Sequence, residues 1–182
     1  MKETFIELIN YLKNPVLAKD ENTDGKYRMK KFLYLFLICI VTSFAIIPLL
    51  SLIENTGLID ASQHSSEILM KNNPGLFIMI GIIVAPIIEE IIFRGPLTLF
   101  YNPKYFKNSF FIFTILFGFI HILNFELTTN ALLLSPILVL PQTILGGYLG
   151  FIRVKFGLAW SILLHATYNA FFILISFGSD LF

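Results

Sequence analysis

Charged side chains are scarce in this chain of 182 residues. Asp, Glu, Lys and Arg together make up 14% of it, whereas soluble globular domains carry about 25%. The mean hydropathy is +0.78, and 20 residues are Phe. These values exclude an ordinary soluble domain and indicate a membrane protein. The net charge of +1 gives no reason to expect nucleic acid as a partner.

Cysteine is nearly absent, and we do not expect a cleavable leader segment. Cys39 is the single cysteine, so an internal disulfide is excluded, and its apolar surroundings predict a packing role. Residues 1–31 are too polar for a cleavable signal peptide. Residues 5–12 predict a short amphipathic helix on the membrane surface, and residues 19–31 a charged linker.

Five apolar segments follow, and the first is long enough to cross a hydrocarbon core about 30 Å thick. The second is long enough if it tolerates Glu89, Glu90 and Arg94, and the third is the shortest. They predict an all-α, polytopic membrane helix bundle of about five transmembrane helices. Residues 1–31 are expected to be a cytoplasmic N-terminal segment, and residues 32–182 one transmembrane domain without internal repeats. The apolar segments are Phe32–Ile53, Leu76–Phe100, Phe110–Leu127, Leu132–Ile152 and Phe156–Phe177.

The basic residues alternate between the two sides of this five-span topology. Seven precede the first span, and two lie in each of the connections after the second and fourth spans, while the connection 54–75 holds only Lys71. The side rich in Lys and Arg is normally cytoplasmic, so we expect the N-terminus inside and the C-terminus outside. The residues of the rich side are Lys2, Lys13, Lys19, Lys26, Arg28, Lys30, Lys31, Lys104, Lys107, Arg153 and Lys155.

The stretch APIIEEIIFRGP places Glu89, Glu90 and Arg94 within an apolar run. An ionisable residue in a spanning helix costs roughly 2.5–3.5 kcal/mol and usually marks a functional site. Glu90 and Arg94 are one turn apart, which predicts a buried ion pair. Glu89 points about 100° away and is therefore available for chemistry.

Three further polar residues lie in other spans. FGFIH contains His121, and HATYN contains His165 and Asn169 on one helical face. Glu89 and His121 form a pair that can activate water, while His165 and Asn169 are suitable donors to an oxyanion. Ser161 shows no activating arrangement, so no nucleophilic side chain is expected.

Each of these groups also has a purely structural interpretation. Glu90 and Arg94 can be an interhelical clamp, and a histidine or asparagine in a membrane can simply hydrogen-bond a neighbouring helix. His64 belongs to the polar connection 54–75 and is expected to be solvated.

The three motifs resemble those of a known family. EEIIFR (89–94) fits EExxxR, FGFIH (117–121) fits FxxxH, and HATYN (165–169) fits HxxxN. In this order they are similar to the CAAX protease and bacteriocin-processing (Abi) family, over about residues 76–177. The resemblance implies an intramembrane endopeptidase, here in a bacterial cell membrane. Eukaryotic members remove the C-terminal tripeptide of prenylated CAAX proteins, and bacterial members are linked to peptide processing and bacteriocin self-immunity.

The resemblance also implies a role for each matched residue. Glu89 and His121 would activate water, His165 and Asn169 would stabilise the oxyanion, and Glu90 and Arg94 would hold the site together. The family has been described both as metalloproteases and as metal-independent glutamate proteases. The chain lacks HExxH, and we expect no cofactor. The alternative is zinc bound by Glu89, His121 and His165.

The substrate expected from this resemblance is a membrane-associated peptide or a membrane protein. Many members have six to eight spans, so a bundle of five spans has fewer helices to enclose a cavity. Whether a prenylated substrate fits, and whether two copies form a homodimer, therefore stay open. Two other functions are a non-catalytic immunity or binding protein and a small proton-linked transporter. Transporters usually show internal repeats, which are missing here.

Overall fold

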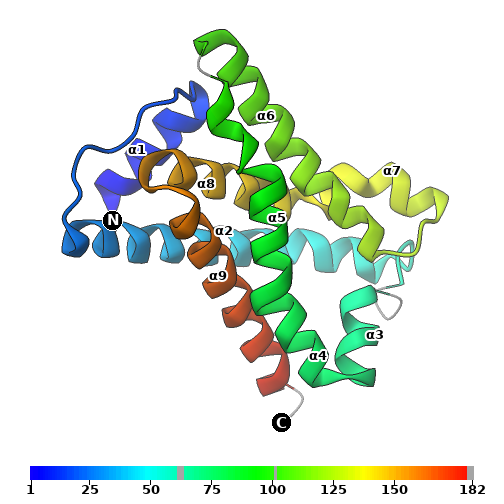
Figure 1. Cartoon of the computed structure of the whole chain (residues 1–182). Helices are drawn as coiled ribbons and strands as arrows, with labels where there is room; N and C mark the ends of the chain where they lie inside the picture. Colours follow the sequence, from blue (N-terminus) through cyan, green and yellow to red (C-terminus); the bar gives the residue numbers. More distant parts are fainter. Residues whose placement is uncertain (61–63, 101, 180–182) are drawn as a thin grey trace.

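The computed structural model describes residues 1–60, 64–100 and 102–179, and within these ranges the chain is helical with no strand (Figure 1). The last residues of the predicted transmembrane domain, 180–182, lie outside this description. The helices are α1 (Lys2–Lys13), α2 (Gly25–Asn55), α3 (Ser65–Asn72), α4 (Pro74–Met79), α5 (Ala85–Phe93), α6 (Pro103–Ile120), α7 (Thr129–Leu138), α8 (Leu140–Phe156) and α9 (Leu158–Ser179).

Five stretches of the described residues are long and apolar enough to cross a membrane. The predicted all-α bundle of five spanning segments is thus confirmed. The first stretch begins at Gly25 rather than Phe32, because Asp24 caps α2 by accepting a hydrogen bond from the Tyr27 amide at 2.8 Å. The predicted linker 19–31 is therefore helical in its second half. The stretches are Gly25–Asn55, Pro74–Leu99, Pro103–Asn124, Thr129–Phe156 and Leu158–Gly178.

The outer surface of the bundle is mainly apolar. Leu133, Leu174 and Val41 expose 75%, 69% and 66% of their surface, and neighbouring isoleucines and leucines are similarly exposed. A soluble monomer rarely carries apolar patches on this scale, whereas a bilayer covers them. Because no water is available there, each spanning segment satisfies its backbone within a helix.

Close contact between α6 and α8 forms the centre of the bundle. A Cβ atom at Gly118 would lie 2.0 Å from Oγ1 of Thr143, and one at Gly146 would lie 3.0 Å from the Phe117 ring. The missing side chains let these two helices approach closely, as small residues do in membrane bundles. Phe110, Phe117 and Leu149 fill the remaining space and are almost fully buried.

The predicted N-terminal helix forms, but it is packed against the bundle. Leu8 and Tyr11 of α1 are buried in the main core against α2 and α8. Lys31 fixes this arrangement by pairing with Glu7 at 2.7 Å and with Asp20 at 2.9 Å. Burial alone would raise the pKa of Asp20, but the hydrogen bonds from Lys31 and Tyr27 lower it on balance.

Two spanning segments are interrupted. A π-helical turn, η2 (Ile80–Val84), separates α4 from α5, and such turns often occur at functional sites. The predicted span Leu132–Ile152 is divided at Val139, where α7 ends and α8 begins with Pro141 in its first turn. Proline is tolerated there because the first amides of a helix have no partner within that helix.

Candidate active site

Helix α5 carries the two glutamates of the apolar run, and their environments differ. Glu90 is fully buried, whereas the Glu89 side chain retains 25% exposure. After Phe93 the helix ends, and the amides of Arg94 and Gly95 both donate to the Glu90 carbonyl at 2.9 Å. A Cβ at Gly95 would lie 2.3 Å from the Ile91 carbonyl oxygen. This ending turns Arg94 back toward Glu90.

Arg94 is 2% exposed, and its Nη1 lies 3.2 Å from Oε1 of Glu90. The predicted pair is therefore present. Its contact is an ion pair without hydrogen-bond geometry, since Nη1 has no hydrogen-bond acceptor among the described residues. Nη2 donates to the Gly146 carbonyl at 3.1 Å, and the guanidinium lies 3.9 Å from the centre of the Phe117 ring. Arg94 thus connects α5 to both α6 and α8.

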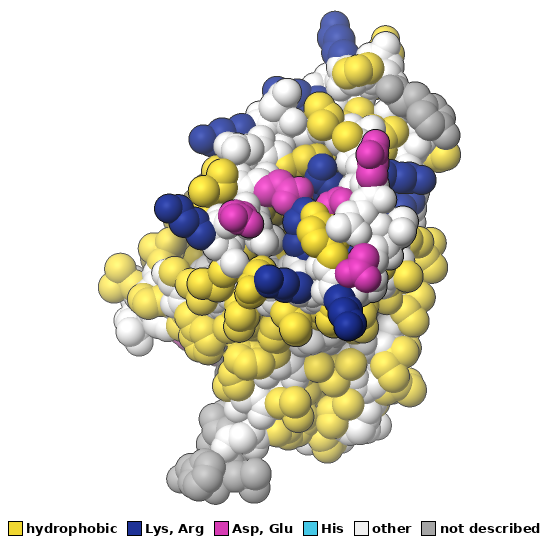
Figure 2. All heavy atoms as spheres, turned by 90° about the vertical axis from the view of Figure 1, so that its left-hand side faces the viewer, with side chains coloured by type: hydrophobic (Ala, Val, Ile, Leu, Met, Phe, Trp, Pro, Cys, Tyr) yellow, Lys and Arg dark blue, Asp and Glu magenta, His cyan; other side chains and the backbone are white. Residues whose placement is uncertain are grey.

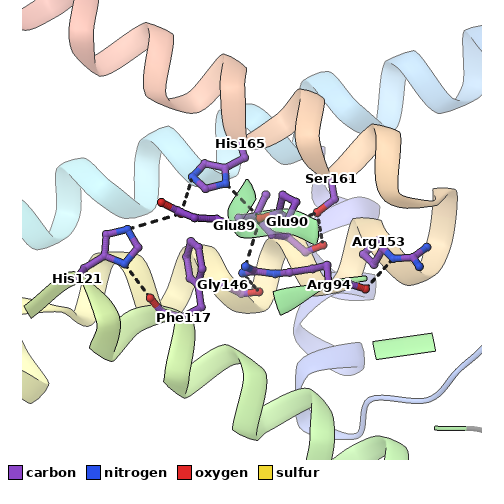
Figure 3. Close-up of polar contacts among 10 residues, drawn as sticks. Glu89, Glu90, Arg94, Phe117, His121, Gly146, Arg153, Ser161 and His165 are labelled. Atoms are coloured by element: carbon purple, nitrogen blue, oxygen red, sulfur yellow. Dashed lines mark hydrogen bonds and ion pairs between the residues drawn. The ribbon is translucent and has the colours of Figure 1, made fainter. Parts of the chain in front are cut away.

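The Glu90 carboxylate has three partners: Arg94 at the end of the same helix, and Ser161 and His165 of α9 (Figure 3). Ser161 donates its hydroxyl to Oε2. Nδ1 of His165 donates to Oε1 at 3.1 Å. We call Glu90, Arg94, Ser161 and the Gly146 carbonyl the support cluster. Every member is bound to another member, which is the condition for a stable buried charge.

Glu89 faces the two histidines instead. Its Oε2 lies 3.9 Å from Nε2 of His121 and 3.8 Å from Nε2 of His165, and Figure 3 shows its carboxylate between the two rings. These distances are too long for direct hydrogen bonds. Oε2 is buried and has no hydrogen-bond partner among the described residues.

The orientation of both rings is fixed at their other nitrogen. Nδ1 of His121 lies 2.7 Å from the Phe117 carbonyl, so it must carry a proton to donate. Nδ1 of His165 carries a proton for Glu90 in the same way. Because one nitrogen of each ring is committed, Nε2 is the atom that each ring turns toward Glu89.

Asn169 lies one turn beyond His165 on α9. Its Nδ2 donates to the Gly81 carbonyl in the π-helical turn at 2.8 Å. An amide nitrogen carries two hydrogens, so one remains for a ligand. We call Glu89, His121, His165 and Asn169 the cavity group, since all four line one cavity of about 460 Å³.

The cavity is bounded by α3, α4, η2, α5, α6, the 3-10 turn η4 (His121–Asn124), α8 and α9. Its apolar lining includes Phe77, Ile80 and Phe172, and its polar lining includes His64 and Gln142. His64 is half-buried, and its ring packs edge-on against Phe125 at 4.7 Å. The expectation that His64 is solvated is therefore met only in part. Burial lowers the pKa of His64, although the nearby Glu67 carboxylate opposes this shift.

Ser161 is the residue of the site that sequence reasoning set aside. It is fully buried and bound to Glu90 and to the Leu149 carbonyl. The sequence does contain a signal for Ser161, because it precedes His165 by four residues and therefore shares the helical face of His165 and Asn169. Gly146 and Gly81 take part through backbone carbonyls, for which a side-chain motif gives no signal.

The cavity group contains the residue types that bind zinc. The hydrogen bonds at Nδ1 of His121 and His165 resemble those that orient metal-bound histidines. Atoms bound to one tetrahedral zinc lie roughly 3.4 Å apart. The 3.8 and 3.9 Å measured here are wider. In the described part of the chain, no three His, Cys, Asp or Glu residues are spaced for a metal ion. A zinc site would need the three side chains to move closer.

No curated protein and no solved structure matches this chain significantly. A family model does match it: the type II CAAX prenyl endopeptidase Rce1-like model covers residues 71–171. That range exceeds half of the chain and contains all three motifs. Together with the five apolar spans, the match indicates an integral membrane protein. The chain therefore belongs to the Rce1-like family of type II CAAX prenyl endopeptidases.

Proposed function

We propose that the protein is an intramembrane endopeptidase that hydrolyses a peptide bond with water activated by Glu89 and His121. One observation carries this proposal. Oε2 of Glu89 lies 3.9 Å from Nε2 of His121 and 3.8 Å from Nε2 of His165, and all three residues line the cavity. Groups at this separation are suited to sharing a bound water.

Two proton acceptors face that water. Glu89 is a carboxylate without an arginine or lysine partner among the described residues, and the Nδ1 hydrogen bond of His121 leaves a lone pair on its Nε2. The water oxygen forms a bond to the substrate carbonyl carbon while Glu89 accepts a proton. When the C–N bond breaks, Glu89 returns the proton to the leaving amine.

His165 and Asn169 are placed to stabilise the oxyanion formed in this step. Asn169 retains one amide hydrogen after its bond to Gly81. His165 is held by its Nδ1 hydrogen bond to Glu90, and its Nε2 faces the cavity. Loss of one such donor typically lowers kcat 10²–10³-fold.

The support cluster supplies rigidity to this arrangement. Glu90 fixes the ring of His165, and Arg94 fixes Glu90 against α8. Because both charged residues are buried, their geometry is set by packing as well as by charge. We infer that these residues keep the reacting groups in position without touching the substrate.

The substrate is a membrane-associated peptide, of the CAAX-like or the bacteriocin type. The mixed lining of the cavity supports this, since Phe77 and Ile80 offer apolar contacts while Asn169 and Gln142 offer hydrogen bonds to a peptide backbone.

Peptide analysis in cells tests the proposal. Membranes from cells with the wild-type protein should contain cleavage products that are missing with Glu89→Gln. Glu126→Gln is the matched control, because it makes the same change at an exposed position in a connection. Identical peptides from wild type and Glu89→Gln would contradict an endopeptidase and favour a non-catalytic binding protein.

A further inference from the structure

The two ends of the bundle differ in charge. At one end, which we call the basic end, lie the residues preceding α2, the connection between α5 and α6, and the connection between α8 and α9. Figure 2 views the molecule from the side of the N-terminal segment and shows dark blue and magenta side chains gathered above a broad yellow surface. The two connections at the opposite end contain one basic residue, Lys71.

Contacts between distant segments define these ends. Lys107 of α6 donates to Asn14 at 3.0 Å, and the Asp20 amide donates to the Lys155 carbonyl at 3.2 Å. Arg153 donates to Thr98 at 3.0 Å. The basic end therefore brings together segments that the five-span topology places on one side of the membrane.

Contacts of the same kind join the connections at the opposite end. Ser65 donates to the Asn124 carbonyl at 3.2 Å, and Asn130 donates to the Leu58 carbonyl at 3.4 Å. His64, Ser65 and Asn124 also line the cavity, and Ser65 is exposed. We call these three residues the cavity mouth. The mouth thus lies at the end that is poor in basic residues.

The support cluster separates the cavity from the basic end. Glu90 and Ser161 are fully buried and Arg94 is 2% exposed, and they lie on the side of Glu89 that faces Arg153 (Figure 3). A substrate therefore cannot reach Glu89 from the basic end without breaking this cluster. The polar part of the lining leads from the cavity mouth to Glu89.

We infer that the cavity opens on the external side of the membrane, and that the substrate is an extracytoplasmic peptide segment cleaved at an internal bond. This inference rests on the proposed endopeptidase function and on the rule that basic connections stay in the cytoplasm.

The lining of the cavity favours an internal peptide bond over a chain terminus. Among the described residues that line it there is no Lys or Arg, so no fixed positive charge pairs with a free C-terminal carboxylate. Oε1 of Gln142 is buried beside the cavity and has no hydrogen-bond partner among the described residues. It is a suitable acceptor for a substrate backbone amide.

Cysteine labelling tests the orientation without requiring activity. Ser65→Cys places a thiol at the cavity mouth, and Thr23→Cys places one at an exposed position before α2. The wild-type protein is the background control, because Cys39 is buried. In intact cells a membrane-impermeant maleimide should label Ser65→Cys, and should label Thr23→Cys only after permeabilisation. Labelling of Thr23→Cys alone in intact cells would overturn the inference while leaving the endopeptidase proposal in place.

Substrate access is tested with membrane vesicles. The probe is a soluble library of decapeptides whose two termini are blocked and therefore uncharged. Right-side-out vesicles should cleave the library, whereas inverted vesicles and right-side-out vesicles with Glu89→Gln should not. Cleavage by inverted vesicles only would overturn an external substrate. Equal cleavage with wild type and Glu89→Gln would instead overturn the proposed function, so the two failures are distinguishable.

Discussion

The support cluster and the cavity group lie side by side, but their glutamate carboxylates differ in hydrogen bonding. In the support cluster, Glu90 is held by Ser161, His165 and Arg94. In the cavity group, Oε2 of the adjacent Glu89 faces two imidazole nitrogens at 3.8 and 3.9 Å without a hydrogen bond. Two glutamates that are neighbours in the sequence therefore have different surroundings.

This difference indicates how a membrane helix can hold charge for two purposes. A buried charge is tolerated where it is paired and hydrogen-bonded, and Glu90 meets that condition. A carboxylate that is to accept a proton from water has to remain accessible to that water, and Glu89 lines the cavity. We expect substitutions in the support cluster to affect mainly stability, and those in the cavity group mainly turnover.

The largest effect on stability is expected from breaking the ion pair of the support cluster. Glu90→Gln leaves Arg94 as an uncompensated buried charge, and Arg94→Gln does the same to Glu90. Each change should lower the free energy of unfolding by roughly 3–5 kcal/mol. Thermal unfolding of the purified protein and the folded yield in membranes measure this loss.

A double-mutant cycle separates a pair from two independent groups. The double variant Glu90→Gln/Arg94→Gln should recover much of the lost stability, because two amides can hydrogen-bond across one helical turn. Glu89→Gln combined with Arg94→Gln should show no such recovery. Additive losses at Glu90 and Arg94, or strong coupling of Arg94 to Glu89, would contradict the separation of the two regions.

In the cavity group, Asn169→Ala should lower kcat by 10²–10³-fold, about 3 kcal/mol, with a smaller change in KM, because an oxyanion donor acts mainly in the transition state. Asn130→Ala is the control, since Nδ2 of Asn130 also donates to a backbone carbonyl but lies outside the cavity. A change confined to KM would assign Asn169 to substrate binding instead.

Much of the fold and most of the candidate site were predictable from the sequence, for separate physical reasons. Apolar segment length marks spanning helices, and spacing by four residues correctly joined Glu90 to Arg94. The start of α2 at Gly25 was missed because a polar, capped first turn carries no hydropathy signal. The break at Val139 and the π-helical turn are backbone features that hydropathy does not report.

Side-chain partners from distant segments were harder to predict. Ser161 was rejected as a nucleophile, but its contact with Glu90 depends on how α9 packs against α5. His64 was expected to be solvated because its connection is polar, yet it is half-buried and its ring packs edge-on against Phe125. Helical spacing reports which residues share a face of one helix, and it does not report which other helix that face meets.

A smaller effect is expected at Ser161. Ser161→Ala removes the hydrogen bond to a buried carboxylate, which should lower the free energy of unfolding by about 1.5–3 kcal/mol and leave substantial activity. Ser135→Ala is a matched control, because that buried hydroxyl donates to the Leu132 carbonyl within α7. Complete loss of turnover with normal stability would instead indicate that Ser161 takes part in the chemistry.

The smallest effect is expected from chelation. If Glu89 and His121 activate water directly, dialysis against phenanthroline should leave the rate of cleavage unchanged, and metal analysis should find far less than one zinc per chain. Loss of activity that returns with added zinc would contradict this mechanism and assign Glu89, His121 and His165 as metal ligands.

The most direct test compares Glu89→Gln and Glu90→Gln as purified proteins, with cleavage of a verified substrate and thermal unfolding measured on both. The account predicts that Glu89→Gln unfolds at nearly the wild-type temperature but loses at least 10²–10⁴-fold in turnover, because glutamine cannot accept the proton. It predicts that Glu90→Gln unfolds at a clearly lower temperature, with lost activity that follows the lost stability. Turnover of Glu89→Gln close to that of wild type, or a stability loss at Glu89 as large as that at Glu90, would contradict the account.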